Sequence, residues 1–255
     1  MISKFTTNSK VINNSLSKGF FFETSSYFKP KDGSKGEDSF SIGKRILCVA
    51  DGVGGWKEHG IDPGQYSKAL VKNYMSLYNN KTNSSNVSDI GLFSKACHLS
   101  KHTTGSSTFC SCRLQNNVLY TLNLGDSGYA LIQKGKITYR SKEQQHSFNF
   151  PFQVGTNGDS PLKAEIKEHD NIEEKDLVIL ATDGLWDNIY EATLLDMILN
   201  GKTANEIGEL CYKLSKNRRY ISPFSINSQL KFLGGKQDDI TILIGMIKRD
   251  INQKL

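Results

Sequence analysis

Four aspartates stand at the ends of predicted strands, and three of them follow strongly apolar runs; they are Asp51, Asp126, Asp183 and Asp238. A carboxylate in this place leaves a rigid strand at the edge of its sheet, and a neighbouring glycine lets other backbone approach closely. If several such strand ends meet, their carboxylates form a dense negative cluster. That cluster is costly unless cations neutralise it.

Carboxylate oxygens suit hard cations such as Mg²⁺ or Mn²⁺ better than they suit zinc. A single Asp-Gly pair is more often part of a β-turn than of a metal site. Because the pattern occurs four times in one chain, a metal site is favoured over isolated β-turns. The residues by themselves indicate a candidate divalent-metal site.

The rest of the chain is strand-rich, with helices in two blocks. Strands are predicted over residues 20–27, 39–42, 45–50, 107–114, 118–124, 128–133, 137–140, 164–168, 177–182 and 240–247. Helices are predicted from Asp62-Pro63 onward, over 90–99, over 192–199, and over 204–214 with Thr203 as N-cap. Residues 79–88 are expected to form a loop and 143–161 to be irregular. Runs of strands between helix pairs predict an α+β fold with sheet packed on sheet and helices outside.

Composition narrows the class of protein. The 255 residues are 37% hydrophobic, enough for one sizeable core, and contain no apolar run of the roughly 20 residues that cross a bilayer. The net charge of +6 comes from scattered basic residues, so we expect no nucleic-acid partner. Five cysteines without Cys-x-x-Cys spacing predict reduced intracellular thiols, with Cys110 and Cys112 on one buried face. Residues 1–16 form a Ser- and Asn-rich segment that is either disordered or presequence-like.

Six motifs in order resemble those of metal-dependent protein phosphatases of the 2C type. They are Glu37-Asp38-Ser39, VADGVGG at 49–55, GSST at 105–108, NLGDSG at 123–128, ATDGL at 181–185 and GGKQDDIT at 234–241. The resemblance spans residues 17–248. The segments at 143–152 and 220–224, together with Trp56, resemble the branch that includes mitochondrial phosphatases.

The resemblance implies one catalytic domain over residues 17–250, folded as a four-layer α/β/β/α sandwich of two antiparallel sheets flanked by helix pairs. It implies two Mg²⁺ or Mn²⁺ ions per site, bridged by Asp51. The other expected ligands are the Gly52 carbonyl, Asp183, Asp238, and Glu37 and Asp38 directly or through water. Asp126, with Asp183, matches a weaker third-metal position. Asp239 is expected to stand behind the ligands.

The implied reaction is hydrolysis of phosphoserine or phosphothreonine in proteins, with Asp51, Asp183 and Asp238 as the catalytic carboxylates. Two cations lower the pKa of a bridging water and neutralise the phosphoryl oxygens. The resulting hydroxide attacks phosphorus in line, without a covalent enzyme intermediate.

Two positions depart from the family pattern. Val53 replaces a histidine proposed as general acid, and Gly33 replaces a phosphate-binding arginine. We therefore predict Lys31, Lys35 and His146 as substrate-binding residues, although a solvated loop lysine or an ordinary loop histidine explains each one as well.

Two alternatives stay open. A catalytically silent phosphoprotein-binding module would be expected to have lost a ligand, and none is lost here. A hydrolase of small phosphate esters would need a closed pocket. The expected partners are phosphorylated proteins. We expect a monomer inside the cell, in the cytoplasm or the mitochondrion.

Overall fold

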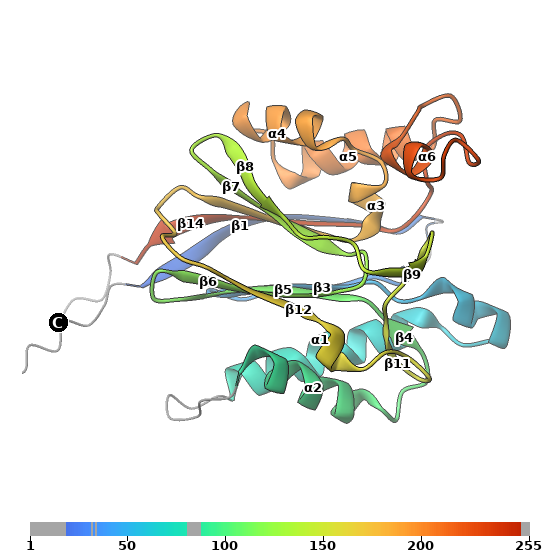
Figure 1. The fold of residues 1–255 in the computed structure, drawn as a ribbon, viewed down its shortest axis with the longest axis horizontal. Helices are drawn as coiled ribbons and strands as arrows, with labels where there is room; N and C mark the ends of the chain where they lie inside the picture. Colours follow the sequence, from blue (N-terminus) through green and yellow to red (C-terminus); the bar gives the residue numbers. More distant parts are fainter. Residues whose placement is uncertain (1–18, 32, 34, 81–87, 251–255) are drawn as a thin grey trace, which may run out of the picture.

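The computed structural model describes residues 19–250 except 32, 34 and 81–87. Two five-stranded antiparallel sheets face each other at its centre (Figure 1). The first has the strand order β1 (Phe20–Lys29), β14 (Ile240–Arg249), β13 (Leu177–Ala181), β7 (Gly128–Gln133) and β8 (Lys136–Arg140). The second has the order β12 (Glu165–His169), β6 (Val118–Leu124), β5 (Phe109–Gln115), β3 (Ile46–Ala50) and β2 (Ser39–Ile42).

Helices cover the outer face of each sheet. The pair α1 (Pro63–Asn79) and α2 (Asp89–Ser100) lies on the second sheet, whereas α4 (Glu191–Leu199) and α5 (Ala204–Ser215) lie on the first (Figure 1). Because both faces of each sheet are covered, the central strand β3 is apolar throughout, and all five of its residues are buried. The predicted four-layer α/β/β/α sandwich is confirmed.

Three apolar layers hold the sandwich together. Side chains such as Leu47, Val49 and Leu243 fill the space between the sheets, and one further cluster lies under each helix pair. Cys110 and Cys112 both point into the layer between the sheets, as predicted, and all five cysteines are free thiols.

The helix starts follow from local chemistry. Asp62 caps α1 by accepting a hydrogen bond from the Gly64 N–H at 2.9 Å, and Pro63 occupies the first helical position. Thr203 and Glu206 form a reciprocal capping box at the start of α5. The predicted caps of both helices are therefore confirmed.

Several short elements were not predicted. The segment expected to be irregular contains β9 (Gln145–Ser147), β10 (Phe150–Pro151), β11 (Val154–Gly155) and the 3-10 turn η2 (Pro161–Lys163); β11 pairs with β4 (Ser106–Ser107). Three short helical elements were also missed: η1 (Gly54–His59), α3 (Asp183–Trp186) and α6 (Pro223–Asn227). Elements of two to six residues are too short to show a hydrophobic period.

Three further predictions are not tested by the structure. Residues 1–16 lie outside the described part of the chain, as does most of the loop expected at 79–88. The catalytic-domain bounds of 17–250 stay a prediction. In the described ranges, no helix is both long enough and apolar enough to span a membrane.

Candidate metal centre

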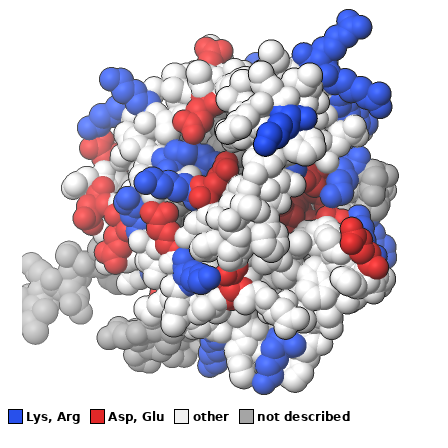
Figure 2. Space-filling model, turned by 45° about the vertical axis from the view of Figure 1, so that its right-hand side comes forward, with Lys and Arg blue, Asp and Glu red and all other residues white. Residues whose placement is uncertain are grey.

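The aspartate-bearing strand ends converge at one end of the sandwich. Asp51 follows β3, Asp126 follows β6, and Asp183 opens α3 directly after β13. Carboxylate oxygens of these three residues lie within 4.8 Å of one another. They line a pocket of about 250 Å³, here called the acidic pocket, together with Asp238 and the turn Gly52–Gly55. Figure 2 turns this end of the molecule forward and shows acidic side chains recessed between uncharged surfaces.

Glu37 and Asp38 approach the acidic pocket from the loop before β2. Glu37 lines the pocket, and its carboxylate pairs with Lys57 and, at 3.2 Å, with Lys31. Asp38 is buried, and its Oδ2 accepts hydrogen bonds from the hydroxyls of Thr182 at 2.8 Å and Thr241 at 2.6 Å. These two hydroxyls fix the direction of the Asp38 carboxylate.

Asp239 holds this loop in place. Its carboxylate accepts hydrogen bonds from the backbone N–H groups of Lys31 at 2.9 Å, of Glu37, and of Asp38 at 3.3 Å. Gly36 adopts a φ of +76°, and a Cβ there would lie 2.9 Å from the Asp239 carboxylate. Asp239 therefore lies behind Glu37 and Asp38 and holds their backbone, and its role in supporting metal ligands stays a prediction.

Burial and mutual repulsion dominate the electrostatics of the cluster. Burial raises the pKa of Asp51 well above its ordinary value, and the nearby Asp38 and Asp183 raise it further. Burial, followed by the charge of Asp183, likewise raises the pKa of Asp126. Burial alone would also raise the pKa of Asp238, but Lys236 and Lys31 hold it below its ordinary value. The carboxylates are thus crowded beyond what the local lysines neutralise.

The donor set fits hard divalent cations. Oδ1 of Asp38, of Asp126 and of Asp183 is buried without a hydrogen-bond partner in the described part of the chain. A buried carboxylate oxygen without a donor is costly, whereas Mg²⁺ and Mn²⁺ bind such oxygens directly.

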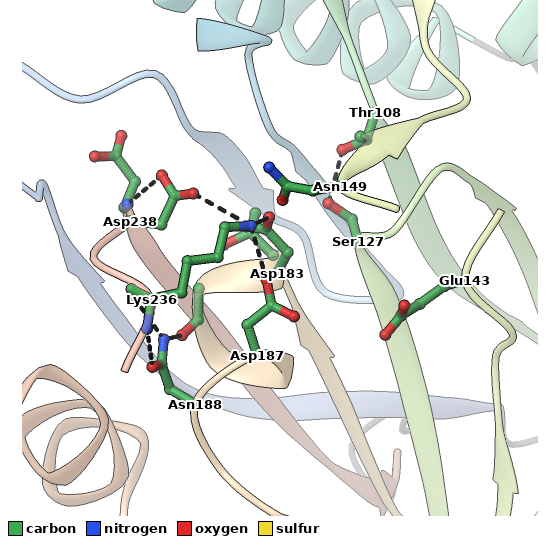
Figure 3. A network of polar contacts seen from close by, with 12 residues as sticks. Thr108, Ser127, Glu143, Asn149, Asp183, Asp187, Asn188, Lys236 and Asp238 are labelled. Atoms are coloured by element: carbon green, nitrogen blue, oxygen red, sulfur yellow. Dashed lines mark hydrogen bonds and ion pairs between the residues drawn. The ribbon is translucent and has the colours of Figure 1, made fainter. Parts of the chain in front are cut away.

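Lys236 is a residue of the site that the sequence analysis missed. Its ammonium contacts the carboxylates of Asp183, of Asp187 at 2.7 Å and of Asp238 at 3.5 Å (Figure 3). The side chain of Asn188 bonds both the N–H and the carbonyl of Lys236, at 2.9 and 2.8 Å. The signals in the sequence were its place in the GGKQDDIT motif and its position two residues before Asp238. Thr108 and Asn149, which also line the acidic pocket, lie in the GSST motif and in the 143–152 segment but were not predicted as site residues.

The three predicted substrate-binding residues lie in different places. Lys31 lines the acidic pocket, with its ammonium 2.9 Å from Asp238. Lys35 lines two other cavities, of about 400 and 500 Å³. His146 lines a neighbouring cavity of about 430 Å³ and pairs with Asp159 at 2.9 Å. The geometry brings only Lys31 to the carboxylate cluster, and the roles of Lys35 and His146 stay predictions.

The position of the missing histidine is occupied by an apolar residue at the pocket. Val53 lines both the acidic pocket and the cavity of His146, and it presents an apolar side chain to each. His59 lies in the His146 cavity beside Trp56, with ring centroids 6.0 Å apart.

Comparisons with known proteins agree on one family. Probable protein phosphatase 2C 55 of Arabidopsis thaliana is 34% identical over 232 residues, covering 85% of this chain and 49% of the relative. Protein phosphatase PTC7 homolog fig of Drosophila melanogaster is 34% identical over 249 residues, covering 84% of this chain and 77% of the relative. The chain thus spans about half the length of the first and about three quarters of the second. No family model matches the chain.

Solved structures share the fold. The photosystem II phosphatase PBCP matches with a TM-score of 0.82 at 25% identity, over 89% of this chain and 99% of that one. The catalytic domain of the serine/threonine phosphatase PstP, solved with two manganese ions, matches with a TM-score of 0.65 at 15% identity, over 89% of this chain and 99% of that one. The second likeness concerns the fold alone. Fold, motif order and relatives together show that the chain belongs to the metal-dependent protein phosphatases of the 2C type.

Proposed function

We propose that this chain is a metal-dependent protein serine/threonine phosphatase. The observation that carries the proposal is the acidic pocket itself, where oxygens of Asp51, Asp126 and Asp183 lie within 4.8 Å of one another and two of these residues keep a buried oxygen without a donor. A structure that shares this fold was solved with two manganese ions, which supports the interpretation of the cluster as a metal site.

In this proposal two Mg²⁺ or Mn²⁺ ions are held by carboxylates and one backbone carbonyl. The ligands are Asp51, Asp183, Asp238, the Gly52 carbonyl, Glu37 and Asp38, and Asp126 with Asp183 holds a weaker third ion. When bound, such ions neutralise phosphoryl oxygens and lower the pKa of water. Asp239 keeps Glu37 and Asp38 at the pocket through their backbone N–H groups.

Lys31 is the residue we propose for binding the phosphoryl group in place of the family arginine. Burial lowers its pKa, but Asp238 and then Glu37 more than offset this and leave the pKa raised. A lysine ammonium is charged at neutral pH even at its ordinary pKa, so in this proposal Lys31 serves as an anchor for an anion.

The surroundings of the acidic pocket favour a polypeptide over a small ester. The cavity of about 430 Å³ shares Val53 and Gly55 with the acidic pocket, and the cavity of about 500 Å³ shares Glu37 with it. A chain of adjoining depressions suits an extended substrate, whereas a metabolite enzyme encloses its ligand. The silent-module alternative has no support from the carboxylates, because each expected ligand is present.

The proposal is tested by phosphate release from a phosphothreonine peptide with Mn²⁺, against the same reaction with excess EDTA. We expect release with Mn²⁺, none with EDTA, and none from Asp183→Ala, which loses a charged ligand. Asp196→Ala, which removes an exposed carboxylate on α4, is the matched control and should keep full activity. Full activity of a folded Asp183→Ala protein at saturating Mn²⁺ would refute the metal assignment.

Two narrower proposals concern the molecule in the cell. We propose a monomer, checked by light scattering coupled to size exclusion. We also propose an intracellular location, cytoplasmic or mitochondrial, which fits five free thiols of which four are buried. Fractionation with a tagged protein distinguishes the two compartments.

A further inference from the structure

Three phenylalanines form an exposed aromatic cluster, here called the aromatic platform. Phe148 comes from the β9–β10 hairpin, and Phe224 and Phe232 come from α6 and the loop after it. Their ring centroids lie 5.0 Å apart for Phe148 and Phe224, 5.9 Å for Phe224 and Phe232, and 6.1 Å for Phe148 and Phe232. Phe148 is 41% exposed and Phe232 is 56% exposed.

The segment that carries Phe224 and Phe232 also exposes three other apolar side chains, those of Ile226, Leu230 and Leu233. Single apolar residues are common on protein surfaces, but contiguous apolar patches of this kind mark binding sites. Neither the metal-binding proposal nor the packing of the sandwich uses these side chains.

The backbone under the platform is fixed by hydrogen bonds. The hydroxyls of Ser222 and Ser225 both donate to the Gly234 carbonyl, at 2.7 and 2.8 Å. The Phe232 N–H donates to the Ser228 hydroxyl at 3.2 Å, and the Phe224 N–H donates to the Asp187 carbonyl at 3.1 Å. A surface held in this way is preorganised, so that binding does not first have to order the loop.

The platform is continuous with the acidic pocket at two points. Asn149, directly after Phe148, lines the acidic pocket. The Lys236 ammonium lies 5.3 Å from the Phe224 ring centroid and 3.5 Å from the Asp238 carboxylate. The distance from the Phe224 ring to the Asp238 carboxylate is therefore at most the sum of 5.3 Å and 3.5 Å. About three residues of extended chain, at roughly 3.3 Å each, span that gap.

We propose that the aromatic platform binds an apolar side chain of the substrate polypeptide, within about three residues of its phosphorylated serine or threonine. This inference rests on the proposed phosphatase function and adds a sequence preference to it. A phosphorylated polypeptide is the occupant favoured here, because its phosphate would sit in the acidic pocket while a neighbouring side chain reaches the adjoining platform. The hairpin β9–β10 supplies a residue to each of the two surfaces and so sets their spacing.

The test compares phosphothreonine peptides in a Gly-Ser background that carry one leucine at successive positions, from three before to three after the phosphothreonine. We expect leucine in at least one position to lower KM. In Phe232→Ala this benefit should disappear, with KM for the preferred peptide rising roughly three- to tenfold and kcat unchanged, because the lost contact is the same in the ground state and the transition state. Leu199→Ala, which truncates another side chain of 56% exposure on α4, is the matched control.

Hydrolysis of para-nitrophenyl phosphate separates the two proposals, because this small ester carries no side chain for the platform. Absence of its metal-dependent hydrolysis would defeat the phosphatase proposal itself. Normal hydrolysis with no leucine preference, or a preference that survives in both Phe232→Ala and Phe148→Ala, would overturn the platform proposal alone. Loss of liposome binding in Phe232→Ala with unchanged peptide kinetics would reassign the platform to a membrane and overturn the proposal too.

Discussion

Replacing Lys236 with methionine is the sharpest perturbation of the acidic pocket, because one ammonium contacts three carboxylates there. Only 13% of the Lys236 side chain is exposed, and Asp183 and Asp187 beside it are exposed by 10% and 12%. Methionine nearly matches the length of lysine and leaves these carboxylates without their cation.

The expected loss of folding stability follows from the burial of the Lys236 partners. Removing one partner of a buried ion pair costs about 3–5 kcal/mol, because the remaining charge stays buried without compensation. We expect the lower end, about 3 kcal/mol, since Lys31 still contacts Asp238 at 2.9 Å. In a chain of this length that corresponds to a fall in Tm of roughly 6–12 °C for the metal-free protein.

Bound metal should reverse most of the loss. Ligands that bind only the folded state stabilise it, and a cluster that has lost a positive charge attracts divalent cations more strongly. The Mn²⁺-induced rise in Tm should therefore be larger for Lys236→Met than for the parent protein.

The assay is thermal unfolding followed by circular dichroism, once in EDTA and once in saturating Mn²⁺. Lys202→Met is the matched control, because it makes the same change in an exposed ion pair with Glu206 on α5 and should alter Tm little. If Lys236→Met unfolds within about 2 °C of the parent in EDTA, the reasoning from buried charge is wrong. A smaller Mn²⁺-induced rise in Tm in the variant would refute the argument that loss of the Lys236 charge strengthens cation binding.

Three other outcomes are expected. Asp239→Ala should weaken Mn²⁺ binding in calorimetry about tenfold or more, since the loop before β2 loses the acceptor of three backbone N–H groups. Arg113→Leu should lower the urea-derived free energy of unfolding by about 3 kcal/mol, because it leaves the buried carboxylate of Asp89, now 2.7 and 2.8 Å from the guanidinium, unpaired. Burial, then Lys167, lowers the pKa of His169 in the folded protein, so stability should fall as pH drops below about 6.5, and His169→Gln should flatten that fall in unfolding curves between about pH 7 and 5.

The arrangement of strands and helices was predictable because most elements are long enough to show their period. Tyr66, Leu70 and Tyr74 recur at helical spacing and are buried on one face of α1. The carboxylate cluster was predictable for a related reason. A residue at the end of a buried strand lies at the edge of the sheet, so Asp51 and Asp126 indicated a candidate cluster, and the family resemblance placed them in one site.

Contacts between loops could not be predicted in this way. Lys236 reaches Asp187 across 49 residues of sequence, and two hydrogen bonds of the Asn188 side chain hold the Lys236 backbone in place. The aromatic platform joins Phe148 to Phe232 from segments without a hydrophobic period. Such contacts depend on how short elements pack after the sheets have formed, and local propensity says little about that.

Lysines around the acidic pocket divide into two groups by their exposure. Lys31 and Lys57 contact Glu37 from the rim, with side chains 27% and 49% exposed, whereas Lys236 is 13% exposed. Lys236 also pairs with Asp187, which is outside the proposed ligand set, and so keeps a carboxylate partner when cations occupy the others. Within the described residues, the Lys31 ammonium contacts two carboxylates, those of Glu37 and Asp238, and both belong to proposed ligands. Cations that take over those two carboxylates would therefore release the Lys31 ammonium toward an incoming phosphoryl group and leave Lys236 where it is. In the proposed mechanism, a lysine that metal binding makes available would then take the place of the family arginine, whose position is Gly33 here.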